Sequence, residues 1–244
     1  WEHLDKWVLR SFDGVVAVSG QIEQELSEAG VSMARLRRIE NGIDAPARNF
    51  ALGAAIRREF SIPVDEKLIV QIGRLAPSKR NDLLLDALVK LPARPHVIFV
   101  GEGEQRAALD RRIAELGIGA RVHFAGYRTD ILSFLSAANV LAISSDHEGL
   151  PIVLLEAMAA ECPVVSTRVG DIGNVIADGR DAWLVTRGDV NEFGAALGQA
   201  IADNAQASAR AASALIRFQL GHSREAMGGK YLELYEKAWL RRCR

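Results

Sequence analysis

"LIVQIGRLAPSKRNDLLLDALVKL", residues 68–91, joins a short apolar run to an amphipathic segment of helical length through a loop that contains glycine and proline. Residues 97–100 are apolar throughout, which is typical of a strand that helices cover on both faces. Further segments of helical length alternate with short apolar runs at 96–101, 121–126, 140–144 and 163–167. We therefore predict an α/β fold with a doubly wound parallel sheet.

Segment 41–53, "NGIDAPARNFALG", interrupts this alternation with turn-forming residues and no periodicity, and so predicts a linker. Residues 1–47 would then be the end of an earlier domain with its linker, and residues 48–220 a complete α/β domain. Residues 221–244 predict a helix with one apolar stripe, which we expect to pack across the domain boundary. The chain opens with Trp1 and soon enters an apolar strand that needs neighbouring strands, so we expect a missing N-terminal domain upstream.

The composition indicates a globular protein. The 244 residues are 49% hydrophobic and carry a formal net charge of -1, which gives no general attraction to nucleic acid. Cys162 and Cys243 are the only cysteines, and they belong to no metal-ligand spacing or disulfide framework. No apolar run is long enough to span a bilayer. We expect a cytoplasmic location, no nucleic-acid partner and no metal cofactor.

In open α/β sheets ligands bind at the carboxyl ends of the strands, so the loops there are the first candidates for a site. Gly73, Arg74 and Lys79 follow the apolar run 68–72 and precede a helix. Two cations in one such loop, beside the positive end of a helix, make a candidate diphosphate site. The alternative is a solvated basic turn, to which Arg80 would also belong.

The next loop reads "GEGEQR", residues 101–106, and is similar to the start of a dinucleotide-binding fingerprint. The sixth position is Arg106, where close packing between helix and strand requires glycine. A dinucleotide-dependent oxidoreductase is therefore disfavoured. We interpret Gly101 and Gly103 as a tight turn that lets a ligand approach.

Two carboxylates occur eight positions apart in "SSDHEGLPIVLLEAMAAECPVV", residues 144–165. Pro151 suits the first position of a helix, so Glu148 and Gly149 should lie in the loop that leads into it. Glu156 would lie five residues into the helix, a rise of roughly 7.5 Å. The two carboxylates are then too far apart to share a proton, and we expect them to hold different parts of one ligand.

The helix around Glu156 is apolar nearly all round, so this carboxylate must be paired or hydrogen-bonded. Two adjacent sugar hydroxyls can donate to both of its oxygens. An Arg or Lys on a neighbouring helix is the alternative, and the residues alone favour neither.

Three motifs together resemble one protein family. "EGLPIVLLEAMAAECPVVST", residues 148–167, resembles the E-x7-E signature of the retaining glycosyltransferases of family 4. "IGRLAPSK", residues 72–79, is similar to the Gly-Arg-Leu and Lys element of that family. "RRIENGID", residues 37–44, resembles the segment in which the first domain passes into the linker. The order and spacing of the three agree, and the match covers essentially the whole chain.

The resemblance implies a GT-B fold, which has two Rossmann-like domains with the active site in the cleft between them. This chain would hold the second domain and the end of the first. It implies transfer of a hexose from a UDP- or GDP-linked nucleotide diphosphate sugar to a glycan or lipid-linked acceptor, in polysaccharide biosynthesis. Because the upstream domain supplies the acceptor surface, the fragment alone should have low activity. A non-catalytic nucleotide-sugar binding module remains the alternative.

The resemblance also implies roles for individual residues. Arg74 and Lys79 would neutralise the leaving diphosphate, Glu148 would touch the transferred sugar, and Glu156 would hold the ribose hydroxyls. The nucleobase would lie against the turn "GYRTD", near the backbone of Arg128. The other donor-binding residues implied are Gly73, Gly149, Leu150 and Ile152.

Two features depart from the family pattern or extend beyond it. Glu161 stands where the family usually has glycine, so the helix must end with a non-glycine residue in an unusual conformation or end differently. Trp239 with Arg241, Arg242 and Arg244 suggests peripheral contact with the inner face of a membrane. We favour a solvated helix end, whose cations suit the helix dipole.

Overall fold

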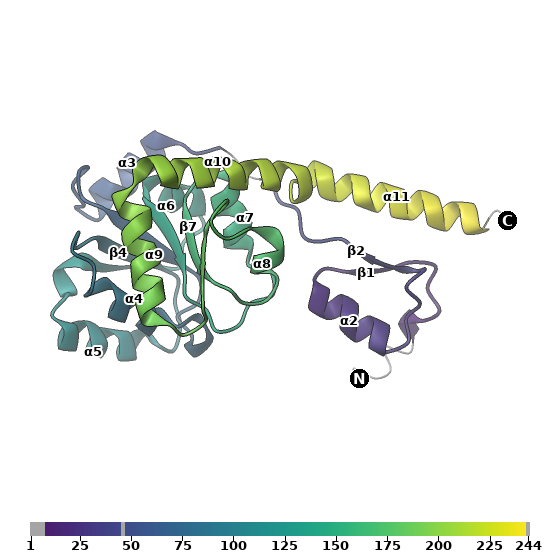
Figure 1. Ribbon diagram of the computed structural model, residues 1–244, viewed down its shortest axis with the longest axis horizontal. Helices are drawn as coiled ribbons and strands as arrows, with labels where there is room; N and C mark the ends of the chain where they lie inside the picture. Colours follow the sequence, from purple (N-terminus) through teal and green to yellow (C-terminus); the bar gives the residue numbers. More distant parts are fainter. Residues whose placement is uncertain (1–7, 45–46, 243–244) are drawn as a thin grey trace. The chain divides into compact units, whose positions relative to one another are not determined.

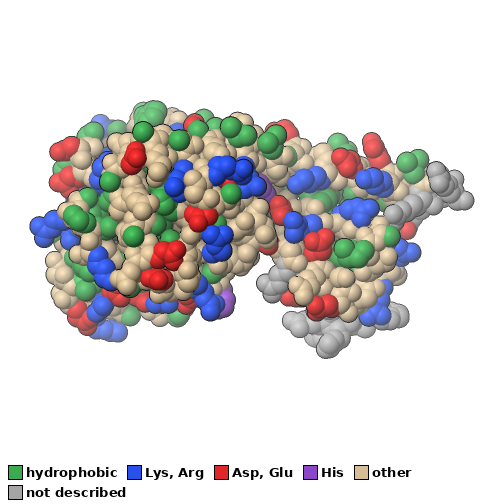
Figure 2. Space-filling view, in the orientation of Figure 1, with side chains coloured by type: hydrophobic (Ala, Val, Ile, Leu, Met, Phe, Trp, Pro, Cys, Tyr) green, Lys and Arg blue, Asp and Glu red, His purple; other side chains and the backbone are tan. Residues whose placement is uncertain are grey.

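The computed structural model describes residues 8–44 and 47–242 (Figure 1). The chain divides into two compact units, which are described separately. The larger unit spans Ala45–Arg217, and the smaller unit combines Trp1–Asp44 with Phe218–Arg244. Positive and negative side chains are interspersed over the face of the larger unit in Figure 2, in keeping with the small net charge.

A six-stranded parallel sheet forms the centre of the larger unit. Its spatial order is β5-β4-β3-β6-β7-β8, so the chain runs outward from β3 in one direction and then from β6 in the other. Leu68 pairs with His96 on one side of β3, and Ile69 pairs with Val140 on the other. The strands are β3 (Leu68–Ile72), β4 (His96–Val100), β5 (Val122–Gly126), β6 (Val140–Ile143), β7 (Val164–Thr167) and β8 (Trp183–Val185).

Helices cover both faces of this sheet (Figure 1). Ile69, Val97 and Phe99 point into a core shared with α4, α5 and α9, and the residues between them are equally buried against the other face. The helices are α3 (Phe50–Glu59), α4 (Asn81–Leu88), α5 (Arg106–Leu116), α6 (Ile131–Ala137), α7 (Ile152–Ala159), α8 (Ile172–Val175), α9 (Val190–Ala202) and α10 (Asn204–Gly221), with short 3-10 turns η1 (Pro77–Lys79) and η2 (Gly119–Arg121). The predicted doubly wound parallel fold is confirmed.

The end of α7 answers the question raised by Glu161. This residue has φ 50°, in the left-handed region that a helix end of this kind requires and that glycine adopts without strain. The start of the helix differs slightly from the prediction, because Pro151 has an extended backbone and occupies the N-cap position before the first helical residue. The helix therefore begins at Ile152.

The predicted linker 41–53 was too long. Helix α3 begins at Phe50, because the side chain of Asn49 accepts hydrogen bonds from the backbone amides of Ala51 and Leu52. The boundaries of the larger unit lie three residues before the expected positions 48 and 220.

The smaller unit has parallel strands β1 (Val15–Ala17) and β2 (Leu36–Arg38), with α2 (Gly20–Glu28) and α11 (Arg224–Arg242). The amide of Gly42 donates to Met227 Sδ at 3.2 Å, and a Cβ on Gly14 would lie 3.0 Å from Leu234 Cδ1. Part of the predicted apolar stripe of α11 therefore packs within this unit.

Trp239 on α11 is 70% exposed. Cys243 and Arg244 lie outside the described residues, as do the side chains of Arg241 and Arg242. Within the part of the chain that the structure describes, no helix is both long and apolar enough to cross a membrane.

Candidate functional site: the carboxyl ends of β3 and β6

The candidate site lies where the winding of the sheet reverses. Strands β3 and β6 are neighbours, and the chain leaves them toward helices on opposite faces, which opens a crevice at their carboxyl ends. The loop after β3 carries Gly73, Arg74 and Lys79, and the loop after β6 carries Glu148 and Gly149. The topology therefore brings the two predicted loops together.

Lys79 and Glu148 form an ion pair across these loops. Lys79 Nζ lies 2.6 Å from Glu148 Oε1, and Ser145 Oγ donates to the same carboxylate oxygen at 2.6 Å. The side chain of Glu148 is only 10% exposed, and that of Lys79 is 28% exposed. The net charge of the pair is zero. An incoming anion can therefore pair with Lys79 only when Glu148 accepts hydrogen bonds from another group in its place.

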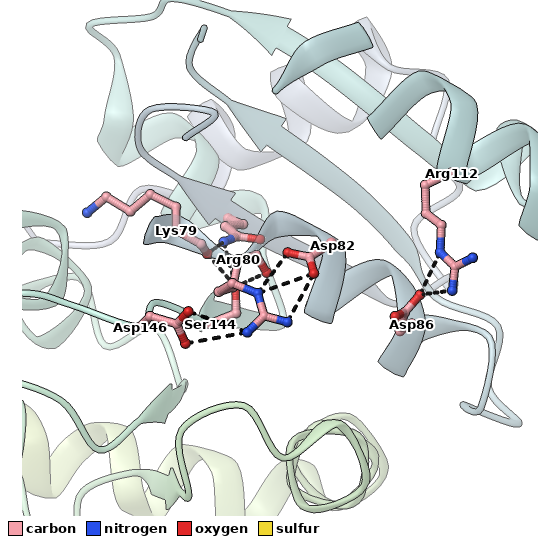
Figure 3. Close-up of polar contacts among 8 residues, drawn as sticks. Lys79, Arg80, Asp82, Asp86, Arg112, Ser144 and Asp146 are labelled. Carbon is pink, nitrogen blue, oxygen red and sulfur yellow. Dashed lines mark hydrogen bonds and ion pairs between the residues drawn. The ribbon is translucent and has the colours of Figure 1, made fainter. Parts of the chain in front are cut away.

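A hydrogen-bonded clamp fixes the backbone beneath Lys79 (Figure 3). Gln71 donates to Lys79 O at 3.1 Å and to Ser144 Oγ at 2.8 Å. The hydroxyl of Ser144 lies 2.8 Å from both Lys79 O and Arg80 O. Gln71 and Ser144 are buried, so this clamp ties the end of β3 to the end of β6.

Arg80 belongs to the scaffold. It adopts φ 46° between η1 and α4, and its guanidinium group pairs with Asp82 at 3.0 Å and Asp146 at 3.4 Å. Hydrogen bonds with Asp82, together with the charge of Asp146, raise its pKa above the usual value despite partial burial. Figure 3 shows the side chain of Lys79 extending away from this cluster. In the basic turn, Arg80 therefore has a structural role, while Arg74 and Lys79 line the crevice.

Arg74 is the cation left uncommitted. Its side chain is exposed and has neither ion pair nor hydrogen bond with any residue in the described ranges. Gly73 and Arg74 line two adjoining cavities. The smaller also includes Lys79 and Glu148, and the larger, of about 410 Å³, extends to Tyr127 and Arg128.

Glu156 is half-buried in the middle of α7. Among residues 8–44 and 47–242 its carboxylate has no ion pair and no hydrogen bond, so the alternative of an Arg or Lys partner is not observed there. Burial raises the pKa of this carboxyl above its usual value. A half-buried carboxylate with unused lone pairs is suited to accept hydrogen bonds from a ligand.

The loop before α7 is shaped by close backbone packing. Gly170 has φ 53°, and a Cβ there would lie 2.0 Å from Glu148 O, so only glycine fits. The amide of Asp171 also donates to Gly149 O at 3.0 Å. Sequence reasoning gave Gly170 no role in the site, although its glycine-rich surroundings were a signal for a tight contact.

On the open side of this loop, a Cβ on Gly149 would meet nothing within 4 Å. Ile152, at the first position of α7, is 42% exposed, and Leu150 is partly exposed. The backbone of this segment therefore has room for a ligand in front of it.

The structure adds detail to two interpretations from the sequence. Gly101 and Gly103 also serve the packing of two loops: a Cβ on Gly101 would lie 2.1 Å from Gly73 O, and one on Gly103 would lie 2.3 Å from Leu75 O. These glycines let the loop after β4 pack against the loop after β3. The side chain of Arg128 is held by Glu59 at 2.6 Å and Asp130 at 2.8 Å, and the predicted contact of a ligand with its backbone stays a prediction.

Comparison with known proteins defines the class. Residues 54–215 match the family model described as "Glycosyl transferases group 1", which covers more than half of the chain. The chain therefore belongs to this family. Its Rossmann-like larger unit matches solved GT-B glycosyltransferases in fold.

Two curated relatives show the range of the family. The chain is 32% identical over 225 residues to "Lipopolysaccharide core biosynthesis glycosyltransferase LpsE" of Rhizobium meliloti, covering 92% of this chain and 64% of that protein. It is 31% identical over 189 residues to "D-inositol 3-phosphate glycosyltransferase" of Mycobacterium tuberculosis, covering 75% and 39%. The chain thus spans less than two thirds of the length of either relative.

Two solved structures share the fold. Anabaena Alr3699/HepE in complex with UDP superposes with a TM-score of 0.85 at 23% identity, covering 97% of this chain and 68% of that one. Sucrose-phosphate synthase from Thermosynechococcus elongatus gives a TM-score of 0.80 at 27% identity, covering 98% and 61%.

Proposed function

We propose that this protein is the donor-binding part of a retaining family 4 glycosyltransferase. It would move a hexose from a UDP- or GDP-linked sugar to a glycan or lipid-linked acceptor. The observation that carries the proposal is Glu156, a half-buried carboxylate without a partner among the described residues, on the same helix as Val153, which lines the cavity that also includes Arg74 and Lys79. The names of the relatives and the UDP complex of Anabaena HepE support the same chemistry.

In the proposed reaction Arg74 and Lys79 stabilise the charge that develops on the departing diphosphate. Arg74 is exposed and uncommitted within the described chain, so it can bind phosphate at little cost. Lys79 exchanges Glu148 for phosphate, and the freed carboxylate then accepts hydrogen bonds from hydroxyls of the transferred sugar. Fixed cations supply this stabilisation without a metal ion.

Glu156 would hold the nucleoside. Adjacent hydroxyls of a ribose can donate to both oxygens of one carboxylate, which meets the need of this group for hydrogen bonds. The nucleobase would then occupy the cavity of about 410 Å³ beside Tyr127 and the backbone of Arg128. The amides of Gly149, Leu150 and Ile152 would face the sugar and phosphates, while Gly73 keeps the β3 loop close to them.

Calorimetric titration with UDP and with GDP tests the assignment. We expect one of them to bind, and expect Glu156→Ala and Lys79→Ala each to weaken binding about tenfold or more. Glu236→Ala, at an exposed position on α11, is the matched control and should bind normally. Unchanged affinity in both site variants would refute the site assignment.

A second measurement separates an enzyme from a non-catalytic binding module. Both would bind the nucleotide, but only an enzyme transfers sugar when the whole protein receives donor and acceptor. We expect the 244-residue chain alone to turn over slowly, because the acceptor surface belongs to the other domain. Rapid transfer by this chain alone would contradict that expectation.

A further inference from the structure

A second cavity with cations in its lining lies at the opposite ends of the strands, away from the candidate site. It has a volume of about 390 Å³ and is lined by the loops 89–94 and 116–121, which follow α4 and α5. These loops lead into β4 and β5, so they meet at the amino ends of the strands, whereas Lys79 and Glu148 lie at the carboxyl ends. We call this cavity the amino-edge groove.

The lining of the amino-edge groove carries only positive charge. Lys90, Arg94 and Arg121 face it together with apolar residues, and no carboxylate is among the lining residues. The nearest acids on α4 and α5 are engaged elsewhere: Asp86 and Glu115 pair with Arg112, at 2.7 and 3.1 Å. Figure 3 shows the pair between Asp86 and Arg112.

Within the described ranges, the guanidinium groups of Arg94 and Arg121 have no partners that would explain their position. Nη1 of Arg121 is buried without a hydrogen bond, and the side chain of Arg94 has none within the described residues. Burial, followed by the charge of Arg94, lowers the pKa of Arg121. Arg94 also holds a left-handed backbone conformation, φ 45°, that is strained for arginine.

Arginines near the C-terminal end of a helix often donate hydrogen bonds to its last carbonyls. Arg94 and Arg121 do not have this role at the ends of α4 and α5 in the described chain. The last carbonyls of α4 accept from the backbone amides of Lys90 and Leu91, and those of α5 accept from the amides of Gly117 and Ile118. Neither arginine donates to these carbonyls in the described chain. Two carbonyls near the end of each helix are therefore satisfied by the backbone and not by these arginines.

We propose that the amino-edge groove binds the phosphate group of a small phosphomonoester through Arg94, Arg121 and Lys90. A dianion matches three cations in the lining of one cavity better than a single carboxylate does, and planar guanidinium groups bind phosphate oxygens bidentately. Lys90 donates to Asn191 Oδ1 at 2.6 Å and retains further N–H donors. The volume and the mixed polar and apolar lining suit a ligand the size of a sugar phosphate.

NMR titration of the whole chain with glucose 6-phosphate tests this proposal, with inorganic phosphate as the minimal probe. The Lys79→Ala background reduces phosphate binding at the carboxyl edge. We expect amide shifts to concentrate in residues 89–94 and 116–121, and Arg94→Gln or Arg121→Gln to weaken binding at least tenfold. Arg111→Gln, an exposed cation on α5 outside the groove, should leave affinity unchanged.

Three outcomes decide between the alternatives. Absence of shifts in both loops at about 20 mM of either phosphate, together with no sedimentation on vesicles containing phosphatidic acid, would overturn the proposal. Binding that both arginine variants retain would overturn it as well. Sedimentation with vesicles containing phosphatidic acid, lost in Arg121→Gln and without response to free phosphates, would support the phosphate chemistry and assign its source to a lipid headgroup.

Discussion

Two carboxylates in the larger unit have opposite surroundings. Asp181 has a side chain that is 0% exposed, and it accepts hydrogen bonds from several donors. Glu156 is half-buried and has none within the described residues. The donors to Asp181 are the amide of Ala177 at 2.8 Å, Ser213 Oγ at 2.6 Å, Arg217 Nη1 at 3.0 Å and Arg180 Nε at 3.1 Å.

The pKa values of the two groups follow from this difference. Burial acts to raise the pKa of Asp181. Hydrogen bonds from Arg180, Ser213, the amide of Ala177 and Arg217 outweigh this effect and hold the pKa at about 2. Burial alone raises the pKa of Glu156. A carboxylate that stabilises the fold has its lone pairs satisfied by the chain, while one that serves a ligand keeps them available.

The largest effect is expected at Asp181. Asp181→Asn should lower the free energy of unfolding by roughly 3–5 kcal/mol, because it removes the fully buried negative charge with which Arg180 and Arg217 pair. The wild-type contribution should be fully present above the unfolded pKa of about 3.9 and be lost as the pH falls toward 2. Urea unfolding across this range measures it, and a loss below about 1 kcal/mol would make the cluster dispensable.

The double variant Arg74→Ala, Lys79→Ala should have the next largest effect. We expect nucleotide affinity to fall about 100-fold, roughly 2.7 kcal/mol, because both crevice cations are removed. Loss of Arg74 should change stability little, since it is exposed and uncommitted in the described chain, whereas loss of Lys79 leaves the largely buried Glu148 without its cation and should lower stability. Calorimetry measures the affinity, with Arg111→Ala as the control cation. An affinity within threefold of wild type would exclude a diphosphate site here.

Glu156→Gln should separate binding from stability. It keeps the shape but removes the charge, so nucleotide affinity should fall by about a factor of 10, or 1.4 kcal/mol. Stability at pH 7 should rise, because the folded protein no longer buries an unpaired charge. This gain should vanish below pH 4.5, the ordinary pKa, where the carboxyl is protonated in both states. A destabilised variant would mean that Glu156 has a structural partner.

The smallest effect is expected for Glu148→Gln. It releases Lys79 from its ion pair, so UDP without a sugar should bind as well as to wild type or a few-fold tighter. Transfer from the sugar donor by the whole protein should fall, because the contact with the sugar is lost. Weaker UDP binding would show that Glu148 instead holds Lys79 in position.

Much of the fold followed from local pattern. Buried parallel strands such as 97–100 are apolar on both faces, which makes them visible in the sequence. The prediction omitted β8 and α9. Strand β8 has three residues, Trp183–Val185, too few for a periodic signal, and its place at the sheet edge depends on pairing with β7.

The site was less accessible to sequence reasoning, because its geometry depends on contacts between distant residues. Lys79 and Glu148 are 69 positions apart, and their ion pair follows from the neighbouring positions of β3 and β6. The clamp formed by Gln71 and Ser144 spans 73 positions. The role of Gly101, which faces Gly73, likewise appears only once the two loops pack together.

The central claim is that Glu156 keeps its lone pairs for a ligand, and carbon-detected NMR titration of its carboxyl group tests this most directly. Glu156→Gln identifies the resonance. Without nucleotide, the carboxyl should titrate above the ordinary pKa of 4.5. With saturating UDP the pKa should fall, because hydroxyl donors favour the charged form. A pKa that bound UDP leaves unchanged would contradict the account.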